Sequence, residues 1–131
     1  MKWSMAVWLW LVLASVAPAA LVVQVSSPKT TGSKTIVQLE LKNTFTNNIE
    51  SVRAVVFLLD DQGKMSGQAA HWIIGGTKDK PGLTPDGKTT YDFVVPTDKP
   101  FTKTKVMVNR LILENGKTAN PIKDVQILQG Q

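Results

Sequence analysis

The stretch Thr35-Ile36-Val37-Gln38-Leu39-Glu40-Leu41-Lys42 decides the fold class, because apolar and polar residues alternate in it from Val37 onward. The two faces carry Val37, Leu39 and Leu41 on one side, and Gln38, Glu40 and Lys42 on the other. A period of two is typical of a β-strand with one buried face and one wet face. Because the buried face needs a second layer to cover it, the stretch predicts two packed sheets.

The run that follows, Ser51–Asp60, is almost continuously apolar. Such a run predicts a central strand that is covered on both faces. The chain then continues as Asp61-Gln62-Gly63-Lys64. We expect a tight turn there, with Gly63 at positive φ.

Further short runs rich in β-branched residues predict the remaining strands, and no stretch has the periodicity of an amphipathic helix. The runs are Leu21–Ser27, Met65–Ile74, Thr89–Val95, Lys103–Glu114 and Val125–Leu128, with a polar turn at Thr30–Lys34. About seven strands in a domain of this size indicate an all-β chain, folded as an antiparallel immunoglobulin-like β-sandwich.

Two local signals refine the last third of the chain. The apolar side of the Lys103–Glu114 run changes at Asn109-Arg110, which predicts a β-bulge there. Asn115-Gly116 predicts a type I′ hairpin turn, because both central residues of that turn need positive φ.

The first 19 residues have the parts of a secretory signal peptide. A cationic start at Lys2 precedes an uncharged apolar run and a small-x-small end at Ala17 and Ala19. We therefore expect residues 1–19 to form a signal helix that is cleaved, and residues 20–131 to form one exported domain. Residues 5–23 are also long and apolar enough to stay in the inner membrane as an anchor. Both alternatives place the domain outside the cytoplasm, in the periplasm or secreted.

The composition limits the chemistry that this domain can perform. The chain has no cysteine, which excludes disulfides, thiolate metal sites and a cysteine nucleophile, and His71 is its only histidine. The net charge is +5, of which +4 belongs to residues 20–131 because Lys2 is the only charge before them. No phosphate-binding glycine motif and no Gly-x-Ser-x-Gly is present. We therefore expect no catalytic residue and no cofactor. We also expect no nucleic-acid partner, since one tryptophan in the domain offers no row of aromatics on which bases could stack.

Phe57-Leu58-Leu59-Asp60-Asp61 resembles the motif that names the bacterial FxLYD domain, with Asp60 where the family has tyrosine. The resemblance covers about residues 37–95. Leu41-Lys42-Asn43 is similar to the family's apolar-x-Asn step, and Leu83-Thr84-Pro85-Asp86-Gly87 to its Leu-x-Pro-Gly turn. The resemblance implies an extracytoplasmic β-sandwich module, and it implies no active site.

The adjacent carboxylates Asp60 and Asp61 could offer oxygens to Ca²⁺. A calcium loop needs several acidic residues at alternate positions and a later glutamate. We therefore expect a structural turn and no metal. A small metal-dependent hydrolase built on these two residues is the weakest alternative.

His71-Trp72 could contribute to a ligand-binding surface. Neighbouring side chains of a strand point to opposite faces, so the two cannot easily share one site. We expect Trp72 to be the single large core side chain and His71 to face solvent.

Basic residues gather at Lys99, Lys103, Lys105 and Arg110. Such a cluster could bind a phosphate-rich lipid or a polysaccharide, whereas lysines along an edge strand also protect against aggregation. The candidate ligand surface therefore consists of His71, Trp72, Lys103, Lys105 and Arg110.

These observations predict an exported, non-catalytic accessory or binding module of the bacterial envelope. Its partner would be a protein or polysaccharide of that envelope, which the sequence does not identify. The alternative is a membrane-anchored structural or interaction protein that keeps residues 5–23, and only this alternative brings the domain to a membrane.

Overall fold

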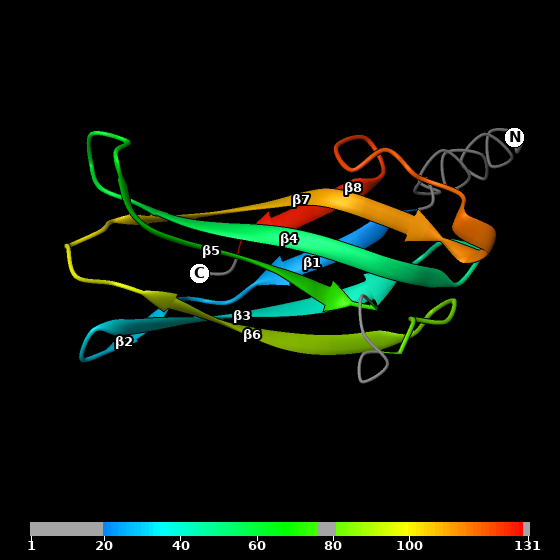
Figure 1. The fold of residues 1–131 in the computed structure, drawn as a ribbon, viewed down its shortest axis with the longest axis horizontal. Helices are drawn as coiled ribbons and strands as arrows, with labels where there is room; N and C mark the ends of the chain where they lie inside the picture. Colours follow the sequence, from blue (N-terminus) through cyan, green and yellow to red (C-terminus); the bar gives the residue numbers. More distant parts are fainter. Residues whose placement is uncertain (1–19, 76–80, 130–131) are drawn as a thin grey trace, which may run out of the picture.

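The computed structural model describes residues 20–75 and 81–129, and these residues form a β-sandwich of two sheets (Figure 1). The predicted signal helix at residues 1–19 lies outside the described residues. In the described part of the chain, no helix is long and apolar enough to cross a membrane.

Eight strands build the two sheets, one more than the sequence predicted. They are β1 (Leu21–Val25), β2 (Lys29–Thr31), β3 (Lys34–Asn43), β4 (Ile49–Leu59), β5 (Met65–Ile74), β6 (Lys88–Pro96), β7 (Lys103–Leu113) and β8 (Val125–Gln129). The additional strand, β2, lies where a polar turn was expected. It pairs with the start of β3 through a tight turn at Gly32, which has a positive φ of 63°.

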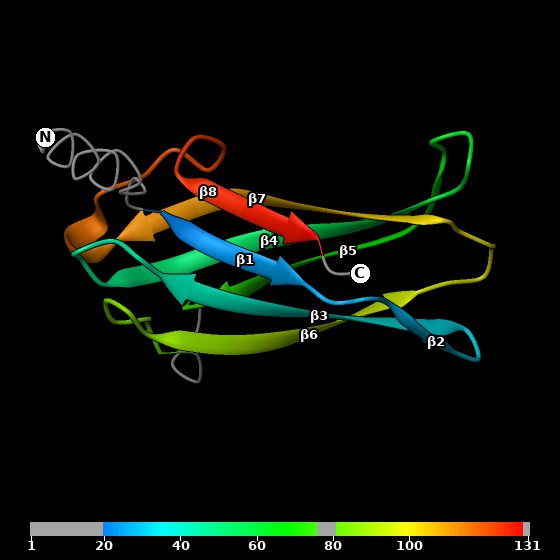
Figure 2. The ribbon, with the colours of Figure 1, turned by 180° about the vertical axis from the view of Figure 1, so that it is seen from behind.

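The five-stranded sheet contains β3 at its centre. β6 pairs with one side of β3, β1 and β2 pair with the other side, and β8 follows beyond β1. The three-stranded sheet has the order β5-β4-β7. All ladders are antiparallel except that of β8 with β1, which is parallel, so the expectation of a wholly antiparallel sandwich is wrong in this one ladder. Figure 2 shows β8 beside β1, in the layer opposite β7.

The core lies between the sheets and follows the alternation of β3. Val37, Leu39 and Leu41 are fully buried, and Gln38 and Glu40 are exposed, as predicted. The largest fully buried side chains are Phe93, Leu21, Leu39, Leu41, Ile49, Leu58 and Leu111. Phe93 on β6, and not Trp72, is therefore the large core aromatic.

β4 differs from its prediction. It is the central strand of its sheet, but only one of its faces is covered: Val52, Ala54, Val56 and Leu58 are buried, whereas the side chains between them are half-exposed. The three-stranded sheet therefore has an uncovered outer face that carries apolar residues.

The predicted turns and the bulge are present. Asn109 has no opposite residue, because Arg110 pairs with Arg53 and Val108 pairs with Ala54. Gly63 has φ 79°, and Asn115 and Gly116 have φ 66° and 73°. The Asn115-Gly116 turn does not lead into a hairpin strand. The chain after it makes a single bridge, Thr118 to Ile112, before it crosses to β8 in the other sheet.

Candidate functional site

The outer face of the three-stranded sheet combines apolar and cationic side chains, and we call it the basic face. Its positions follow from the strand register, since residues opposite each other in a ladder share one face. The basic face consists of Arg53, Val55, Phe57 and Leu59 on β4, Met65, Gln68, Ala70 and Trp72 on β5, and Lys103, Lys105, Met107 and Arg110 on β7.

An apolar strip runs along the middle of the basic face. Val55, Phe57 and Leu59 are half-buried, and Met107, opposite Val55, is 40% exposed. Lys105 lies opposite Phe57 and Lys103 opposite Leu59 on the β7 side. Lysine stems can cover such apolar neighbours while the ammonium groups stay in water.

One row across the basic face joins three of its polar and aromatic residues. Arg53 in the central strand lies opposite Trp72 on β5 and opposite Arg110 on β7. Two like charges directly opposite each other in a ladder destabilise the sheet. A guanidinium pair beside an indole is also a suitable contact for a carboxylate or phosphate, because each guanidinium donates in a planar fork.

No carboxylate of these three strands compensates the four cations of the basic face. Glu50 is the single acidic residue in β4, β5 and β7. It lies at a register shift near the start of β4, where its carboxylate accepts a hydrogen bond of 3.1 Å from the Asn115 backbone N–H. The other outer face is mixed in charge, because Lys42 and Lys88 are accompanied there by Glu40 and Asp92.

The structure brings four of the five predicted site residues onto the basic face. Trp72, Lys103, Lys105 and Arg110 lie there, and His71 does not, because it is opposite Ala54 and so lies on the inner face. The expectation that Trp72 is buried in the core is therefore wrong. The cause is a register shift in β5: Ile74 pairs with Val52 and Trp72 with Arg53, so Ile73 is the extra residue and both isoleucines are buried. The expectation that the two side chains point to opposite faces is confirmed.

His71 lies at the open side of the sandwich, where β5 faces β6. Its ring centroid is 5.4 Å from that of Phe93 and 6.4 Å from that of Tyr91, and the two aromatics are in edge contact at 5.2 Å. The imidazole remains largely exposed while one side of it packs on these rings. This cluster closes the edge of the core.

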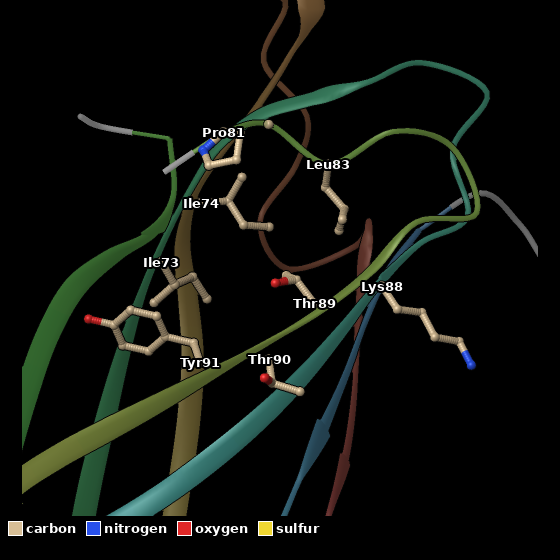
Figure 3. A pocket seen from close by; sticks show the side chains of 9 residues that line it. Ile73, Ile74, Pro81, Leu83, Lys88, Thr89, Thr90 and Tyr91 are labelled. Carbon is tan, nitrogen blue, oxygen red and sulfur yellow. The ribbon is translucent and has the colours of Figure 1, made fainter. Parts of the chain in front are cut away.

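A cavity of about 380 Å³ lies further along the same open side. Figure 3 shows its aliphatic residues, Ile73, Ile74 and Leu83, and shows the Lys88 side chain pointing away from them. The three aliphatic side chains belong to the buried core, and the rest of the lining includes Lys88, Thr89, Thr90 and Tyr91.

Asp60 and Asp61 form the turn that the sequence predicted. The Asp60 carboxylate accepts hydrogen bonds from the backbone N–H groups of Gln62 (2.9 Å) and Lys64 (2.8 Å). Its oxygen is therefore engaged in closing the turn. Among the described residues, no group of three or more His, Cys, Asp or Glu side chains is arranged to hold a metal ion.

The sequence did not identify Arg53, Val55 and Phe57 as parts of the candidate site. β4 was expected to be covered on both faces, so its outer residues were assigned to the core. The charged residue within that run, Arg53, was the signal that one face of β4 is open.

The comparisons with known proteins define the fold and no more. Neither a protein-family model nor a curated protein matches the chain in sequence. A Bordetella pertussis protein provisionally designated ApaA has a similar structure, with a TM-score of 0.58 at 17% identity, over 79% of this chain and 88% of that one. IrmA from Escherichia coli gives a TM-score of 0.55 at 12% identity, over 84% of this chain and 92% of IrmA. The chain therefore shares a β-sandwich fold with these two bacterial proteins.

Proposed function

We propose that the chain is an exported, non-catalytic binding module of the bacterial envelope, and that it contacts a negatively charged partner through the basic face. The observation that carries this proposal is the row Trp72–Arg53–Arg110, in which two arginines lie opposite each other without a carboxylate. A sheet gains no stability from such a pair. An arrangement that costs stability and concentrates hydrogen-bond donors is typical of a binding surface.

The composition of the basic face supports contact with a macromolecule. Tryptophan, arginine, methionine and phenylalanine are enriched at the centres of protein interfaces, and lysine is found at their rims. Here Arg53 and Phe57 lie on the central strand β4, Trp72 lies beside Arg53 on β5, and Lys103 and Lys105 lie on the β7 edge. The positive charge favours an acidic protein or an anionic polysaccharide as the partner.

We further propose that the sandwich is of immunoglobulin-like type. The division of strands supports this: β1, β3 and β6 share one sheet and β4 and β7 the other, as strands A, B and E and strands C and F do in that type. The proposed export rests on residues 1–19. The mass of the exported chain tests it: an N-terminus at Ala20 supports a cleaved leader, and a chain found only in the cytoplasm contradicts export.

Binding through the basic face can be tested with poly-L-glutamate as a model polyanion, titrated calorimetrically against the full-length chain. The double variant Arg53→Gln/Arg110→Gln should weaken binding about tenfold, since two exposed ion pairs are lost. The matched control is Lys42→Gln/Lys88→Gln, which removes the same charge from a cross-strand pair on the opposite outer face. Equal weakening by both double variants would mean that net charge, and not the basic face, binds the polyanion.

A further inference from the structure

The β7 edge is open along half of its length. β7 pairs with β4 on one side. On its other side the Leu113 N–H donates to the Lys117 carbonyl (2.7 Å), and the Ala119 N–H donates to the Leu111 carbonyl (2.9 Å). In the described part of the chain, no backbone segment pairs with this side of residues 103–108. Their outward N–H and C=O groups can therefore accept another strand.

The open edge follows from the position of the last strand. In an immunoglobulin-type sandwich the final strand belongs to the sheet that contains the strand equivalent to β7. Here β8 pairs with β1 and lies in the other sheet (Figure 2). The position beside residues 103–108 is consequently free for a strand from another chain.

An apolar groove of about 240 Å³ lies between this edge and β8. Its aliphatic lining comes from Val106, Val108, Pro121, Ile122, Val125 and Ile127. A cavity of about 150 Å³ with a comparable lining accommodates benzene, so this groove has room for one or two aliphatic side chains.

Ile122 projects from the rim of the groove and is 78% exposed. Its turn is well ordered, because the Asn120 side-chain oxygen accepts hydrogen bonds from the N–H groups of Ile122 (2.9 Å) and Lys123 (2.8 Å). An apolar side chain held in water by a fixed turn contributes to binding without a large ordering cost.

We propose that residues 103–108 of β7 take up an extended, acidic segment of a partner protein as an additional strand. This proposal rests on the proposed function and specifies its partner. On the basic face, acidic side chains of the added strand lie beside Lys103 and Lys105. On the inner face, aliphatic side chains enter the groove next to Val106 and Val108. The expected partner motif thus alternates acidic and aliphatic residues, because successive side chains of a strand point to opposite faces.

The same lysines also repel unsuitable strands. An open edge attracts any extended chain, and lysines on it discourage indiscriminate pairing. Lys103 and Lys105 thus repel a basic strand and attract an acidic one.

The test is a titration of the full-length chain with the synthetic peptide acetyl-Glu-Val-Glu-Val-Glu-Val-amide, followed by calorimetry and by amide exchange. We expect binding that protects amides within residues 103–108. Three altered peptides should bind more weakly. Lysine in place of glutamate removes the charge pairing, and serine in place of valine removes the groove contacts. A central proline removes a ladder hydrogen bond.

Protein variants test the same contacts. Lys105→Glu should weaken binding of the peptide about fivefold, which corresponds to the upper end of the energy range for one cross-strand pair. Ile122→Ser should weaken it about tenfold. Both side chains are exposed, and the control Lys29→Gln lies on the other sheet.

Equal affinity for the proline and parent peptides, or protection of amides outside β7, would overturn strand addition. If the peptide does not bind while poly-L-glutamate still distinguishes the two double variants, strand addition fails and the proposed function stands. If neither ligand binds, both fail.

Discussion

Arg53 and Arg110 lie directly opposite each other on β4 and β7, and a β-bulge at Asn109 creates this pairing. Without the extra residue, the register that pairs Ala54 with Val108 would place Asn109 opposite Arg53. The bulge thus moves a second guanidinium beside the first and at the same time returns Leu111 to the core. One local irregularity serves both the packing of the sandwich and the charge of the basic face.

Reversing one charge of this pair should separate stability from binding. Arg110→Glu converts the like-charged pair into an opposite-charged one, so the free energy of unfolding should rise by about 0.5–1 kcal/mol. Binding of poly-L-glutamate should fall in the same variant. Urea denaturation and calorimetry measure the two quantities.

The control for this variant is Lys88→Glu, which makes the same change opposite Lys42 on the other outer face. It should also stabilise the fold, without the loss of binding that Arg110→Glu causes. A lower free energy of unfolding for Arg110→Glu would contradict the assigned register.

Asn43 should be among the residues on which the fold depends most. It is fully buried, and its side-chain N–H group donates to the carbonyls of Leu83 and Asn47, both at 2.9 Å, while its oxygen accepts from the Phe45 N–H at 2.8 Å. Asn43→Ala leaves these groups without a partner and should lower the free energy of unfolding by roughly 3 kcal/mol. Gln38→Ala, which removes one exposed hydrogen bond to Asp92, should change it by less than about 0.5 kcal/mol in the same urea titration.

The two large aromatics should differ sharply in their effect on stability. Phe93 is fully buried between the sheets, so Phe93→Ala should cost about 3–5 kcal/mol. Trp72 is half-buried on the basic face, and Trp72→Ala should cost about 1 kcal/mol of unfolding free energy while weakening polyanion binding. Comparable midpoints of thermal unfolding for the two variants would contradict the outward position of Trp72.

Gly75 should tolerate no side chain. It has φ 66°, and a Cβ atom there would collide with the Glu50 carbonyl oxygen and approach the Ser51 hydroxyl to 2.7 Å. Gly75→Ala should therefore cost about 3 kcal/mol. Gly32→Ala is the matched control, since Gly32 has φ 63° with no atom within 4 Å of the added Cβ, and it should cost about 1 kcal/mol. Equal losses of unfolding free energy in the two variants would show that backbone strain alone acts at both positions, and that the collision at Gly75 adds nothing.

The sequence predicted the strands well, because the alternation of β3 and the apolar runs of β4 and β7 are strong local signals. It predicted β5 at its observed bounds, Met65–Ile74. The predicted orientation of the Trp72 side chain on β5 was wrong, because an extra residue at Ile73 inverts the alternation and no local sequence pattern indicates it. The sheet membership of β8 is a long-range pairing with β1, which no local pattern encodes.

The candidate site was predicted only in part, because local patterns do not encode how the strands pair. Lys103, Lys105 and Arg110 stand out as charges on a predicted strand, and the bulge near Arg110 was expected. That Trp72 and Arg53 join them depends on the register of three strands, and register is a tertiary property. The elements of the FxLYD resemblance at Asn43 and at Leu83–Gly87 do meet in space, through the Asn43–Leu83 hydrogen bond. The resemblance itself stays a prediction.

Binding of a polyanion to the basic face can be located by mapping backbone amide chemical shifts while the isotope-labelled full-length chain is titrated with poly-L-glutamate. The shifting amides should lie in β4, β5 and β7, centred on Arg53, Trp72 and Arg110, and the shifts should diminish as salt is raised. Shifts centred instead on β3 and β6, around Lys42 and Lys88, would contradict the assignment of the basic face as the binding surface.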